Sequence, residues 1–152
     1  MKMNIKKRTE GFTIIEVLIV LAIAGLIMLV VFLAVPALQR NGRNTAIKTD
    51  ASAIAGGVGE FASNNNGIVA NNATGTGTVV IKAATGTPTN AKVQGTTVVS
   101  TITSWPATAP DPGNIFVLFG KKCDQSSSTR ATAIIYSTEN SGTAPQQQCL
   151  EG

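Results

Sequence analysis

Histidine, the side chain that most often acts in acid–base catalysis, is absent from this sequence. Without histidine, a serine or cysteine nucleophile lacks the base that usually activates it. The carboxylates of the C-terminal half are scattered, and none follows the spacing of a calcium loop. They are Asp111, Asp124, Glu139 and Glu151. We therefore expect no catalytic residues, no metal ligands and no cofactor, and we predict a protein that is not an enzyme.

Two cysteines, Cys123 and Cys149, are separated by 25 residues. This separation matches no common zinc pattern, and no histidine is present to complete a metal site. If this half of the chain lies outside the cytoplasm, a disulfide is expected. It would stabilise the fold by about 3 kcal/mol in the chain-entropy model. In a reducing compartment, the same residues would instead be two buried thiols, and both alternatives stay open at this point.

A single carboxylate, Glu16, lies at the start of a long apolar segment. Residues 17–35 contain no charged and no strongly polar side chain. An ionised carboxylate inside hydrocarbon costs about 3 kcal/mol on insertion scales, and such residues are usually functional and paired. Basic residues upstream could offset this charge in the intact chain. A cut between Gly11 and Phe12 would instead supply a new ammonium group, with Glu16 as the fifth residue of the shortened chain.

The apolar segment is long enough to cross a membrane, since about 20 residues at 1.5 Å each span the hydrocarbon layer. Four Lys and Arg residues precede it, and Arg40, Arg43 and Lys48 follow it. The denser cluster, at residues 6–8, favours an N-terminus in the cytoplasm. A cleaved secretory signal is the alternative, but the run exceeds the usual 7–15 residues, and its small-residue site lies mid-run.

Net charge gives little support for a nucleic-acid partner. The chain carries a formal charge of +4, but the first eleven residues account for most of it, with four Lys and Arg against Glu10. A ligand or DNA could contact Trp105, the pair Lys121 and Lys122, or Arg130. We favour core or loop packing for the tryptophan and a solvated surface for the cations. Nucleic-acid binding is possible but unsupported.

The string GFTIIE at residues 11–16 follows a short basic leader and precedes the apolar run. In this arrangement it resembles the prepilin signal of type IV pilins and type II secretion pseudopilins. The resemblance is close over residues 6–39 and loose beyond. It implies that a prepilin peptidase cleaves after Gly11, that the new amine of Phe12 is N-methylated, and that Glu16 pairs with this amine in a neighbouring subunit during assembly.

The resemblance also implies a function and a set of partners. We expect the structural subunit of a type IV pilus, a helical homopolymer whose assembly uses an ATPase and a platform protein. The subunit would first be a single-pass protein of the cytoplasmic membrane and then part of an extracellular fibre. The alternatives are a minor pilin or secretion pseudopilin, and a bitopic binding protein that stays monomeric in the membrane. The sequence does not choose among adhesion, motility and DNA uptake.

One position departs from the family pattern. Family members commonly carry a helix-bending proline eight residues after a glycine that matches Gly25, whereas Pro36 is eleven residues after it. The three extra residues add almost one helical turn, so the same face is roughly preserved. We expect the helix to bend at Pro36 and Gly42, further along than in those relatives.

Beyond the membrane the helix should continue, because apolar residues recur at helical spacing. They are Ile47, Ala51, Ile54, Val58 and Phe61. We expect this stripe to pack in a core, opposite Arg43, Asp50 and Ser52. Turn-forming residues at 64–67 should end the helix. The helix would then run from Thr13 to about Phe61, roughly 70 Å at 1.5 Å per residue.

Four later segments are rich in β-branched and aromatic residues, at 78–82, 97–103, 115–119 and 133–136. No helix-length apolar pattern separates them. The predicted fold class is therefore α+β, with a long N-terminal helix packed on an antiparallel sheet of about four strands.

We expect four parts along the chain: a leader at 1–11, a membrane and polymerisation helix at 12–38, an amphipathic helix half at 39–63, and a β head at 64–152. Within this head, residues 64–77 should form a loop between the helix and the sheet. By resemblance to pilins, residues 123–149 should form a C-terminal loop bounded by a disulfide.

Overall fold

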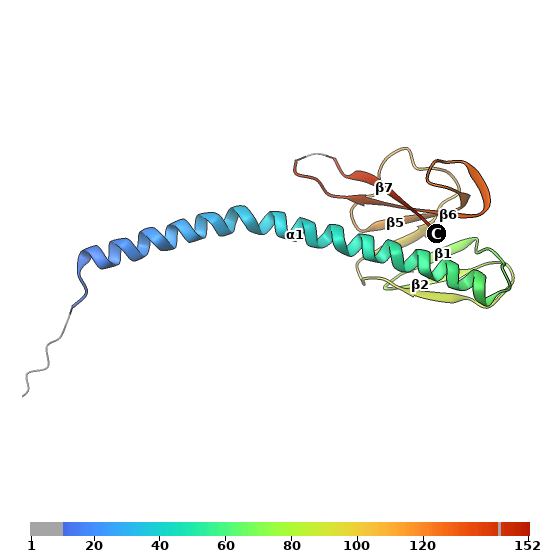
Figure 1. Cartoon of the computed structure of the whole chain (residues 1–152), viewed down its shortest axis with the longest axis horizontal. Helices are drawn as coiled ribbons and strands as arrows, with labels where there is room; N and C mark the ends of the chain where they lie inside the picture. The colour runs from blue at the N-terminus through green and yellow to red at the C-terminus, as the bar shows by residue number, and fades with distance from the viewer. Residues whose placement is uncertain (1–10, 143) are drawn as a thin grey trace, which may run out of the picture. The chain divides into compact units, whose positions relative to one another are not determined.

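The fold is α+β, and the described part of the chain forms one helix followed by seven strands (Figure 1). The computed structural model describes residues 11–142 and 144–152. Helix α1 spans Ile14–Asn64. The strands are β1 (Asn72–Thr76), β2 (Thr78–Lys82), β3 (Thr89–Lys92), β4 (Val98–Thr101), β5 (Asn114–Lys121), β6 (Ser127–Thr138) and β7 (Gln146–Glu151). The predicted fold class is confirmed.

The chain divides into two units, one ending at Leu38 and the other comprising Gln39–Gly152, and α1 contributes to both. In the first unit, the large apolar side chains of α1 are exposed, from 39% at Val35 to 81% at Ile14. The most apolar 18-residue window of α1 has no buried residue, and its length and composition suffice to cross a membrane. Of the predicted leader, only Gly11 falls within the described residues.

The second unit, which we call the head, contains one sheet with the strand order β3-β2-β1-β4-β5-β6-β7. Neighbouring strands are antiparallel except β4 and β5, which are parallel. The expectation of about four antiparallel strands is therefore wrong in both number and direction. Two neighbouring strands can be parallel only when the chain between them returns to the same end of the sheet. Residues 102–113 make this return between β4 and β5 without forming a helix.

Three of the seven strands, β1, β3 and β7, match none of the four segments expected to be strands. Strand β1 lies inside the expected loop at 64–77, β3 lies in a segment left unassigned, and β7 begins inside the segment 123–149 and continues to Glu151. These strands are composed largely of Thr, Asn, Gln and Gly, so they lack the β-branched apolar pattern that identifies a strand in sequence. Their pairing with neighbours holds them in the sheet.

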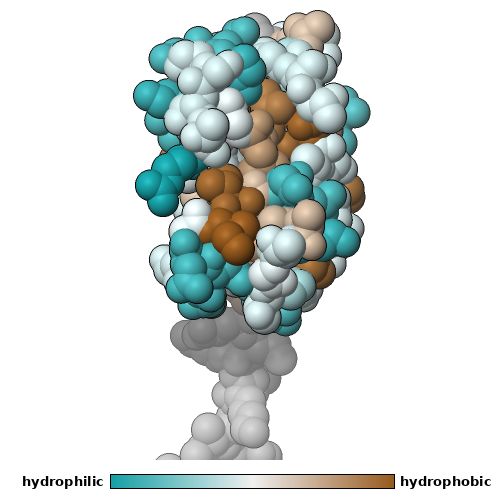
Figure 2. Space-filling view, turned by 90° about the vertical axis from the view of Figure 1, so that its right-hand side faces the viewer, coloured by the Kyte–Doolittle hydropathy of each residue, from teal (hydrophilic) through white to brown (hydrophobic). Residues whose placement is uncertain are grey.

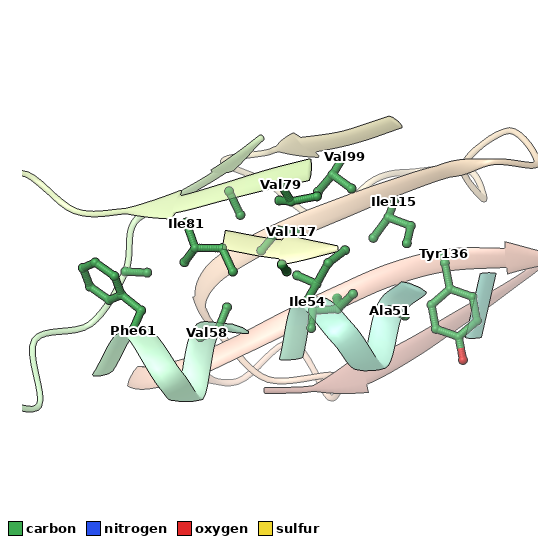
Figure 3. Close-up of a cluster of buried hydrophobic side chains, with 14 of the residues drawn as sticks. Ala51, Ile54, Val58, Phe61, Val79, Ile81, Val99, Ile115, Val117 and Tyr136 are labelled. Atoms are coloured by element: carbon green, nitrogen blue, oxygen red, sulfur yellow. The ribbon is translucent and has the colours of Figure 1, made fainter. Parts of the chain in front are cut away.

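The main core lies between residues 47–61 of α1 and one face of the sheet. The five apolar residues of the predicted helix stripe are all buried, as expected. Figure 3 shows Ile54, Val58 and Phe61 directed from the helix toward strand residues such as Ile81 and Val117. The expected packing of this stripe in a core is confirmed.

A second, smaller core covers the other face of β5 and β6. It contains Leu118, Ala133 and Ile135, against which Ile102 and Trp105 from the β4–β5 connection pack. The expected packing role of Trp105 is therefore confirmed. Strand β6 carries buried side chains on both of its faces because it lies between these two cores.

Asp50 was expected opposite the buried stripe, but it is only 4% exposed. Its carboxylate accepts hydrogen bonds from the backbone N–H of Gln94, at 3.1 Å, and from the hydroxyl of Thr97, at 2.5 Å. Burial of a carboxylate is tolerated when hydrogen bonds compensate for lost hydration. Asp50 therefore fixes the β3–β4 connection to the helix, a role that a helical wheel alone does not reveal.

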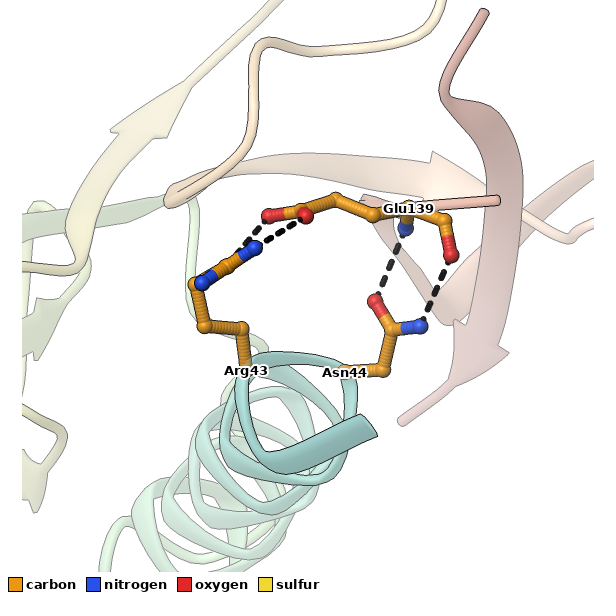
Figure 4. Close-up of polar contacts among 3 residues, drawn as sticks. All are labelled: Arg43, Asn44 and Glu139. Carbon is orange, nitrogen blue, oxygen red and sulfur yellow. Dashed lines mark hydrogen bonds and ion pairs between the residues drawn. The ribbon is translucent and has the colours of Figure 1, made fainter. Parts of the chain in front are cut away.

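A polar clamp joins the first turns of the helix in the head to the end of β6 (Figure 4). Arg43 donates from Nε and Nη2 to the two carboxylate oxygens of Glu139, at 2.8 and 2.7 Å. The Asn44 amide donates to the Glu139 carbonyl and accepts from the Glu139 N–H, at 2.9 and 2.8 Å. The guanidinium of Arg43 holds the pKa of Glu139 below its usual value.

Cys123 and Cys149 are joined by a disulfide, with their Cα atoms 5.7 Å apart. The bond ties the segment after β5 to the edge strand β7. The carboxylate of Glu151 also accepts a hydrogen bond from the Cys123 N–H at 3.0 Å. These contacts secure the far edge of the sheet.

The head has a mixed surface, unlike residues 17–38 of α1, whose large side chains are apolar and exposed. Figure 2 shows one side of the head, where a hydrophobic area is bordered by hydrophilic ones. The exposed large apolar side chains of the head are Ile68, Val80 and Val98, each between 37% and 44% exposed. Scattered residues of this kind are normal on a protein in contact with water.

Candidate functional site

The candidate site is the junction of leader and helix at residues 11–16. Helix α1 begins at Ile14, directly after Thr13. The Glu16 carboxylate oxygen Oε2 accepts hydrogen bonds from the Thr13 N–H at 2.8 Å and from the Thr13 hydroxyl at 2.7 Å. The Glu16 N–H lies 3.4 Å from the Thr13 hydroxyl oxygen, to which it donates. Thr13 and Glu16 thus form a capping box at the helix start.

Reasoning from sequence missed this cap, although the signal was present. The pattern Thr-x-x-Glu before an apolar run is a recognised start signature of helices. From the sequence alone, Glu16 is a charge that needs a cation, either from the upstream basic residues or from a new N-terminus. In the structure one oxygen of its carboxylate is hydrogen-bonded to Thr13 of its own chain, and a negative charge at the helix N-terminus is also favourable.

Nothing among the described residues requires a glycine at position 11. A Cβ atom added at this position would meet no heavy atom within 4 Å. A glycine that the fold does not require is consistent with a requirement imposed by another molecule, such as a peptidase whose cleft accepts only a bare backbone.

Phe12 separates Gly11 from the capping Thr13, and its side chain is 89% exposed. The bond between Gly11 and Phe12 precedes the helix and is not part of its hydrogen-bonded turns. A peptidase can therefore reach this bond without unwinding α1. Cleavage there would place the new amine of Phe12 next to the capping box.

The other predicted site residues lie apart from this junction. The disulfide of Cys123 and Cys149 belongs to the head. Pro36 and Gly42 lie inside α1, whose helical assignment continues through both, and a bend at either position stays a prediction. Lys121 donates to the hydroxyl of Ser127 at 2.8 Å, across the β5–β6 hairpin.

Comparison with known proteins places a family motif on the same segment. Residues 6–32 match the model of the prokaryotic N-terminal methylation motif. No curated protein and no solved structure gave a significant match. The matched motif is the type IV prepilin signal, and it begins in the basic leader and ends within the apolar helix. It supports a type IV pilin-like or pseudopilin protein anchored in a membrane, and suggests a structural rather than an enzymatic role.

Proposed function

We propose that this protein is the structural subunit of a type IV pilus. In this proposal, a prepilin peptidase cleaves after Gly11, the amine of Phe12 is N-methylated, and subunits polymerise through residues 12–38. The single observation that carries the proposal is the first unit of the structure. Its helix exposes large apolar side chains on all sides and carries one carboxylate at its start. Such a surface needs either lipid or other helices around it.

The capping box suggests how Glu16 behaves before and after cleavage. Both Thr13 hydrogen bonds go to Oε2, which leaves Oε1 with lone pairs to accept a further donor. We infer that Oε1 accepts a hydrogen bond from the methylated ammonium group of Phe12 in a neighbouring subunit. Both charges are costly when unpaired in an apolar environment, so the pair would fix the axial register of adjacent helices.

The same proposal assigns a route through the cell. The precursor spans the cytoplasmic membrane with its leader inside, and an assembly ATPase and a platform protein extract it into an extracellular fibre. The disulfide in the head is consistent with an oxidising location for that part. A minor pilin or secretion pseudopilin shares the motif, and its low abundance in purified fibres would distinguish it.

Electron microscopy of sheared surface material, with N-terminal sequencing of its main component, tests the proposal. We expect thin fibres whose main protein begins with N-methylated Phe12. Fibres in which this chain is a trace component would support the minor pilin or pseudopilin instead. A surface form that still begins at Met1 would contradict processing and, with it, the proposed function.

A further inference from the structure

A hollow of about 210 Å³ lies at the end of the head where its helix begins. Residues from α1, the β3–β4 connection, the start of β5 and the end of β6 line it. They include Arg43, Ala46, Gln94, Thr96, Ser137 and Glu139. Pockets that enclose a whole drug-sized ligand measure about 300–1,000 Å³. The hollow is therefore suited to one polar group of a larger molecule.

The walls of the hollow offer hydrogen-bond donors that the head does not use. A guanidinium has five N–H groups, and the Arg43–Glu139 pair uses two of those on Arg43, whose side chain is 58% exposed. Ser137 is 4% exposed, and its hydroxyl has no partner among residues 11–142 and 144–152. A buried hydroxyl of this kind usually binds a water or ligand that completes its hydrogen bonding.

Positive charge is concentrated beside the hollow. Arg40 lies one turn before Arg43 on the same side of the helix, and it is close enough to Glu139 to lower the pKa of that carboxylate. Glu139 is the carboxylate on the wall, and the two cations Arg43 and Arg40 act on it. This excess favours an anionic group.

The position along the helix identifies the source of that group. Leu38 is the last residue of the first unit, and Arg43 follows five positions later. Five residues of helix advance about 7 Å. The polar head-group layer on each side of a bilayer is about 5–7 Å thick. When the apolar helix spans the membrane, Arg40 and Arg43 therefore lie at head-group depth.

We propose that the hollow binds the phosphate of an anionic phospholipid from the leaflet out of which the helix emerges. This inference rests on the proposed function, in which the precursor waits in the membrane before assembly. The lipid would supply phosphate oxygens to the spare Arg43 donors and to Arg40. It would be released when the subunit moves into the fibre, where no bilayer surrounds the helix.

Native mass spectrometry of the full chain in neutral detergent tests the inference. The protein is mixed with phosphatidylglycerol, with phosphatidylcholine, or with inorganic phosphate. We expect selective retention of phosphatidylglycerol and about fivefold weaker retention by Arg40→Gln, the loss expected for one cation near an anionic surface. Lys82→Gln, on strand β2, is the matched control and should bind like the wild type.

A second pair of variants tests the hollow itself. Ala46→Phe places a ring in the hollow and should abolish retention. Ala53→Phe alters the same side of the helix two turns later, outside the hollow, and should have no effect. Circular dichroism and an intact disulfide would show that both variants fold. If Ala46→Phe does not fold, Arg40→Gln still decides the question.

Three results would overturn the inference. They are equal retention of both lipids, unchanged retention by Arg40→Gln, and displacement of the lipid by inorganic phosphate at equal concentration. Fibre formation by wild-type cells separates this inference from the proposed function. Normal fibres without lipid selectivity would refute the lipid site alone. Lipid selectivity without fibres would refute the pilus proposal alone.

Discussion

The two halves of helix α1 contrast in the way they place apolar residues. Residues 14–38 expose apolar side chains all around the helix, whereas residues 39–64 bury a single stripe against the sheet. A helix that meets water on one side needs a polar face, and a helix surrounded by apolar material does not. The contrast indicates that the surroundings of α1 change near Leu38, from lipid or neighbouring helices to the protein's own head.

Gly11→Val gives the largest expected effect on the first half. A side chain at the cut should exclude the backbone from the peptidase and leave the precursor eleven residues longer, which mass spectrometry of membranes would reveal. Gly42→Val is the matched control, since Gly42 also has open space around its Cβ position. It should be processed normally. Efficient cleavage of Gly11→Val would show that the glycine is not needed for processing.

Glu16→Gln separates the two roles of this residue. Gln can keep the capping box with Thr13, because either Glu or Gln serves at this position, but it has no charge. We expect normal cleavage and a near-complete loss of fibres, scored by electron microscopy. Thr13→Val removes the hydroxyl from the cap while keeping the charge, and a lost cap costs about 1 kcal/mol of helix stability. It should still form fibres. Ordinary fibres from Glu16→Gln would disprove the charge pair.

In the head, loss of the disulfide should have the largest effect. The double variant Cys123→Ser/Cys149→Ser should lower the free energy of unfolding by about 3 kcal/mol, since the bond closes a long loop. Urea denaturation of the processed chain in detergent, followed by tryptophan fluorescence of Trp105, would measure it. The single variant Cys123→Ser should be equally destabilised. A change below about 1 kcal/mol would mean that β7 holds its place by strand pairing alone.

Gly57→Ala tests the close approach of helix and sheet. A Cβ atom at Gly57 would lie 2.6 Å from Cδ1 of Ile81 and 3.1 Å from Cβ of Ala91. Overpacking of this kind costs about 1–3 kcal/mol. Gly56→Ala gains the same helix propensity but meets no atom within 4 Å. The difference in urea midpoint between the two variants therefore reports the steric cost, and equal midpoints would show that Ile81 moves aside freely.

The smallest effect concerns the clamp at Glu139. Its pKa is lowered in the folded protein by Arg43. The stabilisation is therefore complete above the unfolded-state pKa of about 4.3 and is lost as the pH falls through the lower, folded-state value. Glu139→Gln should melt slightly below the wild type at pH 7 and equally at pH 2. The non-ionising change Asn44→Ala should give a deficit that persists at both pH values.

The sequence was sufficient to predict the features that depend on apolar periodicity. The membrane-length helix, its core stripe from Ile47 to Phe61 and strand β2 could all be located in this way. Strands β1 and β7 could not, because their Thr, Asn and Gln side chains are held in the sheet by neighbours distant in sequence. The buried Asp50 escaped prediction for the same reason, since its partners lie 44 and 47 residues away.

The candidate site was predictable in part. The positions of Gly11, Phe12 and Glu16 follow from the motif, but the cap formed by Thr13 requires the local geometry. The small core around Trp105 could also be predicted from the sequence only in part. Its tryptophan was expected to pack, yet the crossing of residues 102–113 over the sheet depends on the parallel pairing of β4 and β5.

The clamp between Arg43, Asn44 and Glu139 has a mechanical consequence. It joins helix residues to a position 95 to 96 residues later in the chain. If the proposed fibre were under tension, force on the helix would be transmitted to the head through this clamp and from there to β6. That strand pairs with β5 between Ser127 and Tyr136 and with β7 from Ala133 to Thr138, so several hydrogen bonds would share the load in shear. The strands β1 to β3 would carry little of it.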